Sequence, residues 1–114
     1  DSQPMVHEDT TINEVILEIS EKRLGATAVI KDDKLKGIIT DGDLRRMLEI
    51  EKSFSHLKAK DIMSLEPHII SSRKMAYDAF EIMQDNNINQ IIIMDNNIYI
   101  GIVHIHEILK SGVL

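Results

Sequence analysis

Residues 37–44 read Gly-Ile-Ile-Thr-Asp-Gly-Asp-Leu, and residues 101–108 read Gly-Ile-Val-His-Ile-His-Glu-Ile. The two stretches share a glycine, two apolar residues, a polar residue and an acid three positions later. The match extends without a gap from residues 6–50 to residues 70–114, an offset of 64. Few positions are identical, but apolar positions fall on apolar positions. Self-similarity at a fixed offset indicates one structural unit used twice.

The first copy predicts the order strand, helix, strand, strand, helix. A short extended segment at residues 4–6 precedes a helix whose apolar residues recur at three- and four-residue spacing: Ile12, Val15, Ile16 and Ile19, with Leu24 as a possible extension. Thr10 and Thr11 are alternative N-caps for this helix. Strands at 26–30 and 35–39 enclose a polar turn, and a second helix runs from Asp41 to about Glu49.

The second copy predicts the same order. An extended segment at 67–70 leads to a helix capped by Ser71 or Ser72, with an apolar stripe of Met75, Ala79, Phe80, Ile82 and Met83. Strands at 90–94 and 98–103 follow, and the last helix runs from His104 or Ile105 to about Lys110. Between the copies, residues 59–63 predict a short helical turn.

These elements predict an α/β (α+β) fold of two β-α-β-β-α repeats related by a pseudo-twofold axis. We assign residues 1–50 to repeat 1, 51–60 to a linker and 61–114 to repeat 2. About 45 residues are too few to bury a good core alone, so the repeats should pack on each other. That pairing would create two equivalent clefts, and clefts between packed units are common sites for small ligands.

The composition excludes several classes of function. The 114 residues include no cysteine, so disulfides and thiolate chemistry are absent. The net charge of −6, without a basic stripe and with only four aromatic residues, argues against nucleic-acid binding. No apolar run is long enough to span a bilayer. We therefore expect a cytoplasmic protein without nucleic-acid or membrane partners.

Residues 37–44, the segment Lys60-Asp61-Ile62-Met63-Ser64 and the doubled unit resemble the cystathionine-β-synthase (CBS) domain pair, or Bateman module, over essentially the whole chain. Residues 37–46 and the ending 101–114 more narrowly resemble the C-terminal CBS pair of arabinose-5-phosphate isomerases. In that family an N-terminal sugar-isomerase domain makes arabinose 5-phosphate for 3-deoxy-manno-octulosonate (Kdo) in surface polysaccharide. The resemblance implies that this chain is not itself an enzyme but the regulatory part of such an isomerase. Repeat 1 lacks the Asp-Ile-Met segment ahead of Asp1, so we interpret the chain as a fragment.

The candidate site is the junction of strand and helix around Thr40 and Asp43. Free amides at a helix start favour an anion, and Gly42 removes a Cβ that would crowd a ligand. Thr40 could bind a phosphate, Asp43 could accept from ribose hydroxyls, and Arg45 or Arg46 could reach a phosphate. The alternative is a purely structural role, in which Thr40 and Asp43 only cap the helix. The expected ligand-binding residues are Thr27, Thr40, Asp41, Gly42, Asp43, Arg45 and His104.

Repeat 2 departs from the motif, because His104 and Glu107 stand where Thr40 and Asp43 stand in repeat 1. One working cleft, with His104 lining it from the opposite repeat, is one reading of this difference. His104 and His106 are also potential metal ligands, but no further ligands are evident nearby, and we predict no metal site.

Through the resemblance, cytidine-monophosphate-Kdo, cytidine monophosphate or an adenine nucleotide is the expected effector, and no cofactor is expected. A homodimer or tetramer is the expected assembly, and a purely structural dimerisation module is the alternative function.

Overall fold

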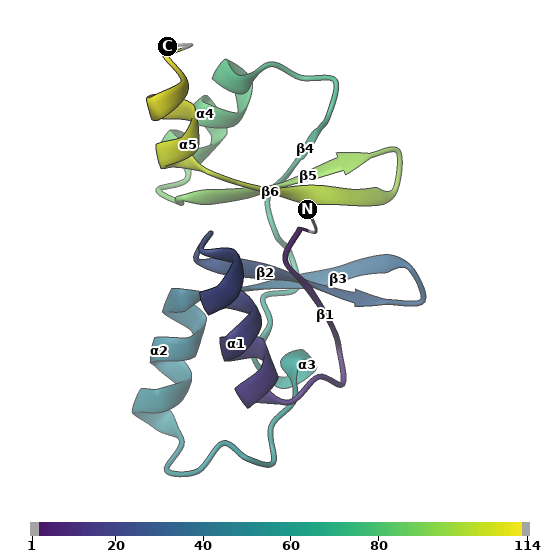
Figure 1. Cartoon of the computed structure of the whole chain (residues 1–114), viewed down its shortest axis with the longest axis vertical. Helices are drawn as coiled ribbons and strands as arrows, with labels where there is room; N and C mark the ends of the chain where they lie inside the picture. Colours follow the sequence, from purple (N-terminus) through teal and green to yellow (C-terminus); the bar gives the residue numbers. More distant parts are fainter. Residues whose placement is uncertain (1–2, 113–114) are drawn as a thin grey trace.

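The computed structural model of the chain describes residues 3–112, so the outer ends of the expected repeats, residues 1–2 and 113–114, lie outside the described residues. Repeat 1 contains β1 (Met5–His7), α1 (Ile12–Lys22), β2 (Ala26–Lys31), β3 (Lys34–Thr40) and α2 (Asp41–Ile50). Repeat 2 contains β4 (Ile69–Ser71), α4 (Ala76–Asp85), β5 (Gln90–Asp95), β6 (Ile98–His104) and α5 (Ile105–Ser111). The expected order is confirmed in both repeats (Figure 1).

The two three-stranded sheets repeat each other residue by residue. In each sheet a parallel pair is followed by an antiparallel hairpin, with strand orders β1-β2-β3 and β4-β5-β6. Each pairing in one sheet recurs in the other with both partners shifted by 64 positions, as in Met5–Ala28 and Ile69–Ile92, or Ala26–Thr40 and Gln90–His104. The sequence repeat is therefore a repeat of backbone register.

Each hairpin closes through two residues in the left-handed backbone region. Asp32 and Asp33 have φ of 52° and 63°, and Asn96 and Asn97 have φ of 53° and 110°. Asp and Asn tolerate this region better than other side chains, and such turns match the twist of paired strands. The polar turns expected from the sequence are confirmed.

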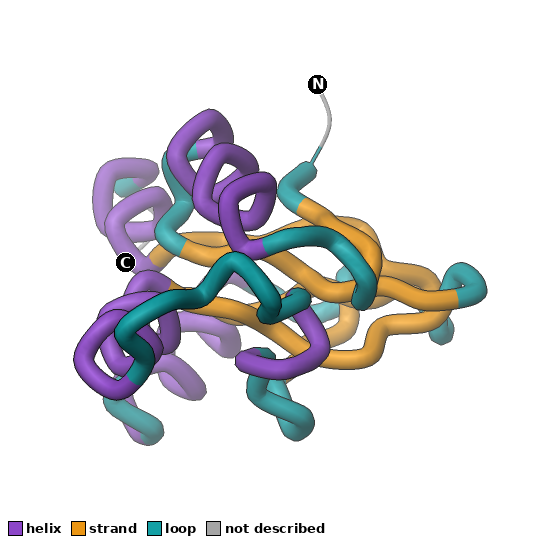
Figure 2. The backbone as a smooth tube through the Cα atoms, turned by 90° about the horizontal axis from the view of Figure 1, so that it is seen from below, coloured by secondary structure: helices purple, strands orange, loops and turns teal. Residues whose placement is uncertain are grey.

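The repeats pack sheet against sheet, with helices on the outer sides (Figures 1 and 2). A central apolar layer lies between the sheets and includes Ala26, Ile38, Ile92 and Ile102. Two further cores lie between each sheet and its own helices. Side chains also form hydrogen bonds between the repeats: the Gln90 amide donates to the Leu24 carbonyl at 3.2 Å, the Tyr99 hydroxyl donates to the Pro4 carbonyl at 2.6 Å, and Gln3 Oε1 accepts from the Ile102 amide at 3.2 Å.

The helix cap follows the prediction in α1 but not in α4. Thr11 is the N-cap of α1, and its hydroxyl accepts from the Glu14 amide at 3.5 Å. In α4 the N-cap is Met75, not Ser71 or Ser72, and the Asp78 carboxylate accepts from the Met75 amide at 3.0 Å. Met75 therefore stands at the helix start, largely exposed, rather than in the buried stripe. The Asp78 carboxylate supplies the reciprocal half of a capping box, and no N-cap side chain accepts from the first turn of α4.

The expected helical turn between the repeats is α3 (Ala59–Ile62), and it packs on repeat 1. Ala59 is fully buried in the core of that repeat. Ser64 exchanges backbone hydrogen bonds with Ile38 of β3 at 2.9 and 3.1 Å. The segment leading into repeat 2 thus completes repeat 1. Within residues 3–112, no helix is both long and apolar enough to cross a membrane.

A candidate ligand cavity between the repeats

A cavity of about 560 Å³ opens where β3 and β6 end, at the opposite end of the sheets from the hairpin turns. Repeat 1 supplies its Thr40–Arg46 segment, and repeat 2 supplies the loop Asn87–Gln90 together with His104. The volume lies within the range of pockets that hold small molecules. Because both repeats form its walls, a bound molecule would be sensitive to how the repeats pack.

The structure brings six of the seven expected ligand residues to this cavity: Thr40, Asp41, Gly42, Asp43, Arg45 and His104. Thr27 is the exception. It is fully buried within β2, and its hydroxyl donates to the Ala28 carbonyl at 3.2 Å. β2 is the central strand of its sheet and is covered on both faces, so Thr27 cannot reach a ligand in the cavity.

Thr40 and Asp43 form a reciprocal cap at the start of α2. The Thr40 hydroxyl accepts from the Asp43 amide at 3.3 Å, while Asp43 Oδ2 accepts from the Thr40 amide at 2.9 Å and from its hydroxyl at 3.1 Å. This is a capping box, as expected if Thr40 and Asp43 cap the helix, with aspartate in the place of the usual glutamate. The hydroxyl proton is already engaged, so Thr40 donates to a phosphate only if it leaves Asp43.

Asp43 has a second partner on its other oxygen. Arg46 donates to Asp43 Oδ1 at 2.6 Å, from a side chain that is 65% exposed, whereas Asp43 is 9% exposed. Each carboxylate oxygen has two acceptor sites, so Oδ1 retains one for a ligand hydroxyl. The helix cap therefore holds the carboxylate through Oδ2, and Oδ1 carries both the Arg46 contact and the remaining acceptor site.

The first amides of α2 differ in what they already bind. The Asp41 amide donates to the Gly25 carbonyl at 3.0 Å, and the Asp43 amide donates to Thr40. Gly42, which lies between them in the chain, lines the cavity. A Cβ at Gly42 would approach the Arg46 guanidinium to 3.4 Å and the Thr40 hydroxyl to 3.5 Å. These are ordinary van der Waals distances, so Gly42 lies beside both arginines without being sterically required there.

His104 contributes from the equivalent position in repeat 2. It is the N-cap of α5, where its Nδ1 accepts from the His106 amide at 3.1 Å and its own amide donates to Glu107 Oε1 at 2.9 Å. Burial lowers the pKa of His104, His106 lowers it further, and Glu107 opposes the shift. Since Nδ1 is an acceptor, the neutral ring carries its proton on Nε2.

Sequence reasoning missed the walls that come from loops. Glu66, Pro67 and His68 of the segment before β4, and the loop Asn87–Gln90 before β5, all line the cavity. One signal could have indicated the loop Asn87–Gln90. Gln90 pairs with His104 across the β5–β6 hairpin, so the end of this loop lies beside a predicted ligand residue.

The described part of the chain holds no group of three or more His, Asp or Glu side chains arranged to bind a metal ion. The His104 and His106 rings stack with centroids 4.8 Å apart and an interplanar angle of 21°. Their closeness therefore reflects ring stacking at a helix start.

The chain belongs to the CBS domain family, whose model matches residues 2–50 and 59–113. The two matches coincide with the two structural repeats, so the molecule is a tandem CBS pair. Its fold is also that of "Crystal structure of CBS domain, NE2398", with a TM-score of 0.89, 20% identity, and coverage of 99% of this chain and 89% of that one. A "CBS domain protein PAE2072 from Pyrobaculum aerophilum complexed with AMP" has a TM-score of 0.83, 19% identity, and coverage of 97% and 91%.

Among curated proteins, the chain is 49% identical over 115 residues to "Uncharacterized protein RP505" of Rickettsia prowazekii, covering 99% of this chain and 35% of that protein. It is 41% identical over 108 residues to "Arabinose 5-phosphate isomerase KdsD" of Francisella tularensis, covering 94% and 33%. The protein of the same name from Yersinia pestis is 33% identical over 112 residues, covering 97% and 34%. The chain thus spans about a third of the length of these relatives.

Proposed function

We propose that this CBS pair is a regulatory module that binds a nucleotide or nucleotide-sugar in the cavity between the repeats. The observation that carries the proposal is the convergence, on one cavity, of a helix start, a buried carboxylate and two arginines. A phosphorylated sugar requires these groups: amides and guanidinium for the phosphate, and a carboxylate for sugar hydroxyls.

The proposed pose follows from which groups still have capacity. A phosphate would accept from the Gly42 amide and from Arg45, next to the positive end of α2. A ribose hydroxyl would donate to Asp43 Oδ1, beside or in place of Arg46. Arg46 is largely exposed, so its head could turn from Asp43 to the phosphate when a ligand enters. His104 and the loop Asn87–Gln90 would contact the ligand from repeat 2.

The larger protein that we propose is an arabinose-5-phosphate isomerase, the name borne by several relatives. In that setting the module's partner is a sugar-isomerase domain, and the chain itself performs no chemistry. Cytidine-monophosphate-Kdo is the effector that pathway logic favours, as the activated end product. An adenine nucleotide is the competing choice, since the structurally similar Pyrobaculum protein is described as complexed with AMP.

A ligand in this cavity would act by favouring one arrangement of the repeats. It regulates an attached domain only as far as it binds one arrangement more tightly than the other. The contacts that would report on this packing are those between repeats, including the Gln90 amide on the Leu24 carbonyl.

Calorimetry with cytidine-monophosphate-Kdo, cytidine monophosphate, AMP and ATP tests the proposal. We expect one of them to bind below about millimolar concentration, and Asp43→Ala to weaken it at least tenfold, about 1.4 kcal/mol. Glu107→Ala is the matched control at the equivalent position of repeat 2 and should change the affinity less than threefold. Absence of binding by all four, or equal effects of the two variants, contradicts the proposal.

A second candidate function is dimerisation without a ligand. Large apolar side chains are exposed on the outer helices, among them Leu48 and Ile50 of α2 and Leu109 of α5. Light scattering with and without the four nucleotides separates the two functions. A stable dimer that no nucleotide binds would favour a scaffold.

A further inference from the structure

The Arg46 guanidinium lies against both groups that the proposed ligand would use. Its Nη2 donates at 2.6 Å to Asp43 Oδ1, the carboxylate oxygen that retains one acceptor site. Its Nη1 would lie 3.4 Å from a Cβ at Gly42, so the same head group also borders the start of α2, where a phosphate is expected. A ligand that enters this part of the cavity therefore has to share Asp43 with Arg46 or displace it.

The position of the guanidinium depends on the Asp43 carboxylate. A helix start carries a partial positive charge, so a cation beside Gly42 is repelled by the helix and held there by the acid. A phosphate at the helix start would offer the guanidinium several acceptor oxygens and draw it away from Asp43. An uncharged nucleoside offers no such acceptor, so its hydroxyls have to compete with Arg46 for Oδ1.

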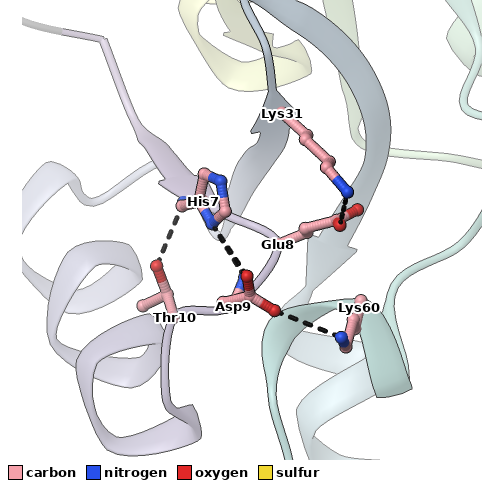
Figure 3. A network of polar contacts seen from close by, with 6 residues as sticks. All are labelled: His7, Glu8, Asp9, Thr10, Lys31 and Lys60. Carbon is pink, nitrogen blue, oxygen red and sulfur yellow. Dashed lines mark hydrogen bonds and ion pairs between the residues drawn. The ribbon is translucent and has the colours of Figure 1, made fainter.

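The ion pair between Arg46 and Asp43 can open without disturbing the fold. Both residues belong to α2, and the Arg46 side chain is 65% exposed. The Lys60–Asp9 pair at 3.2 Å differs, because it connects α3 to the segment between β1 and α1 (Figure 3). The Arg46 contact joins no separate elements, and an ion pair with one exposed partner is worth little. A phosphate can therefore outcompete it.

The equivalent helix start in repeat 2 is built differently. The positions that correspond to the glycine, the acid and the arginine are occupied by His106, Glu107 and Lys110. Glu107 is exposed, and an imidazole side chain replaces the hydrogen atom of glycine. Of these two helix starts, only that of α2 combines a glycine, a buried carboxylate and an arginine on that carboxylate.

We propose that Arg46 makes the cavity selective for phosphorylated ligands, because it competes with a nucleoside for Asp43 but turns to bind the phosphate of a nucleotide. This inference rests on the proposed function and specifies how the same cavity chooses its ligand. Arg45 also lines the cavity, but within the described residues the Asp43 carboxylate pairs with Arg46 and not with Arg45. Arg45 therefore attracts phosphate without opposing a nucleoside, which makes it the matched control.

The test compares cytidine with cytidine monophosphate, and adenosine with AMP, by calorimetry on the parent chain and its variants. Arg46→Ala should bind the nucleoside about threefold more tightly and the nucleotide about threefold more weakly, so the preference for the nucleotide falls about tenfold. Arg45→Ala should weaken the nucleotide without tightening the nucleoside. Arg46→Lys keeps a cation that can pair with Asp43 and should restore most of the preference. Lys60→Ala, which removes an ion pair outside the cavity, should leave both affinities unchanged.

The gain in nucleoside affinity separates competition from a merely structural role, since a distorted cavity would weaken both ligands. If Arg46→Ala binds the nucleoside no more tightly than the parent does, or not at all, the proposal is overturned, while the proposed function stands as long as the parent binds the nucleotide. Equal effects of Arg45→Ala and Arg46→Ala on the nucleoside also overturn it. Failure of the parent to bind either nucleotide below about millimolar concentration contradicts the proposed function, and this inference with it.

Discussion

The starts of α2 and α5 have the same backbone bond and different chemistry. In each, an acid three residues after the N-cap accepts from the N-cap amide at 2.9 Å: Asp43 from Thr40, and Glu107 from His104. Asp43 is buried and also holds Arg46, whereas Glu107 is exposed. Helix formation requires only that the orphan amide be satisfied. The fold therefore preserves the cap in both repeats while only one of them presents a fixed carboxylate and an arginine to the cavity.

The largest expected difference comes from removing the two acids. Asp43→Ala should lower the free energy of unfolding by about 2 kcal/mol, because it deletes the carboxylate half of the capping box and leaves the Thr40 amide and Arg46 without their acceptor. Glu107→Ala should cost about 0.5 kcal/mol, because water can replace an exposed cap. Urea denaturation of the two variants measures both values. Equal losses would mean that the two helix starts are energetically equivalent.

A smaller difference is expected in the loops that lead into β2 and β5. Gly25 has φ +73°, and an added Cβ would lie 2.7 Å from Gln90 Nε2, whereas the equivalent Asn89 is not in the left-handed region. Gly25→Ala should destabilise the fold by about 1 kcal/mol, mainly through backbone strain. Asn89→Ala should have little effect on the unfolding temperature. A Gly25→Ala variant as stable as the parent would show that this loop adjusts freely.

The smallest expected effect is a pH dependence confined to the second cap. The folded-state pKa of His104 is below its ordinary value of 6.5. The unfolded chain therefore takes up the proton first, and stability falls as the pH drops through about 6.5. His104→Thr, which copies the first cap, should remove this component from unfolding curves measured at pH 5 and 8. An unchanged pH difference in that variant would assign the effect to other groups.

The sequence predicted the fold well because the repeat supplies two readings of each element. The apolar residues Val29 and Ile93, or Ile38 and Ile102, occupy equivalent places although the sequence between them varies. The sequence did not reveal on which repeat α3 packs. Residues 59–63 were expected as a helical turn leading into repeat 2, but Ala59 packs into repeat 1. Long-range packing of a short segment leaves no periodic signal in the chain.

The candidate site was predicted in part. The segment Thr40–Asp43 and His104 reach the cavity because a strand end and a helix start are local features that sequence patterns mark well. Thr27 does not line the cavity, because its side chain is fully buried on the face of β2 that carries Val29, and the tertiary packing that decides which positions border a cavity is revealed by no local pattern. The same reason applies to His68 and to the loop Asn87–Gln90. That Asp43 binds a ligand in addition to capping α2 stays a prediction, which the affinity measurements test.

The hydrogen bonds of Gln3 and Pro4 have a mechanical consequence. Gln3 accepts from Ile102 and Pro4 accepts from Tyr99, so the amino-terminal strand is tethered to the carboxy-terminal half before it joins its own sheet. Tension applied at the start of the chain would load the interface between the halves first, not the helix α1 that follows in sequence. Any sliding of one half over the other would in turn displace the amino end, so the two movements are mechanically coupled.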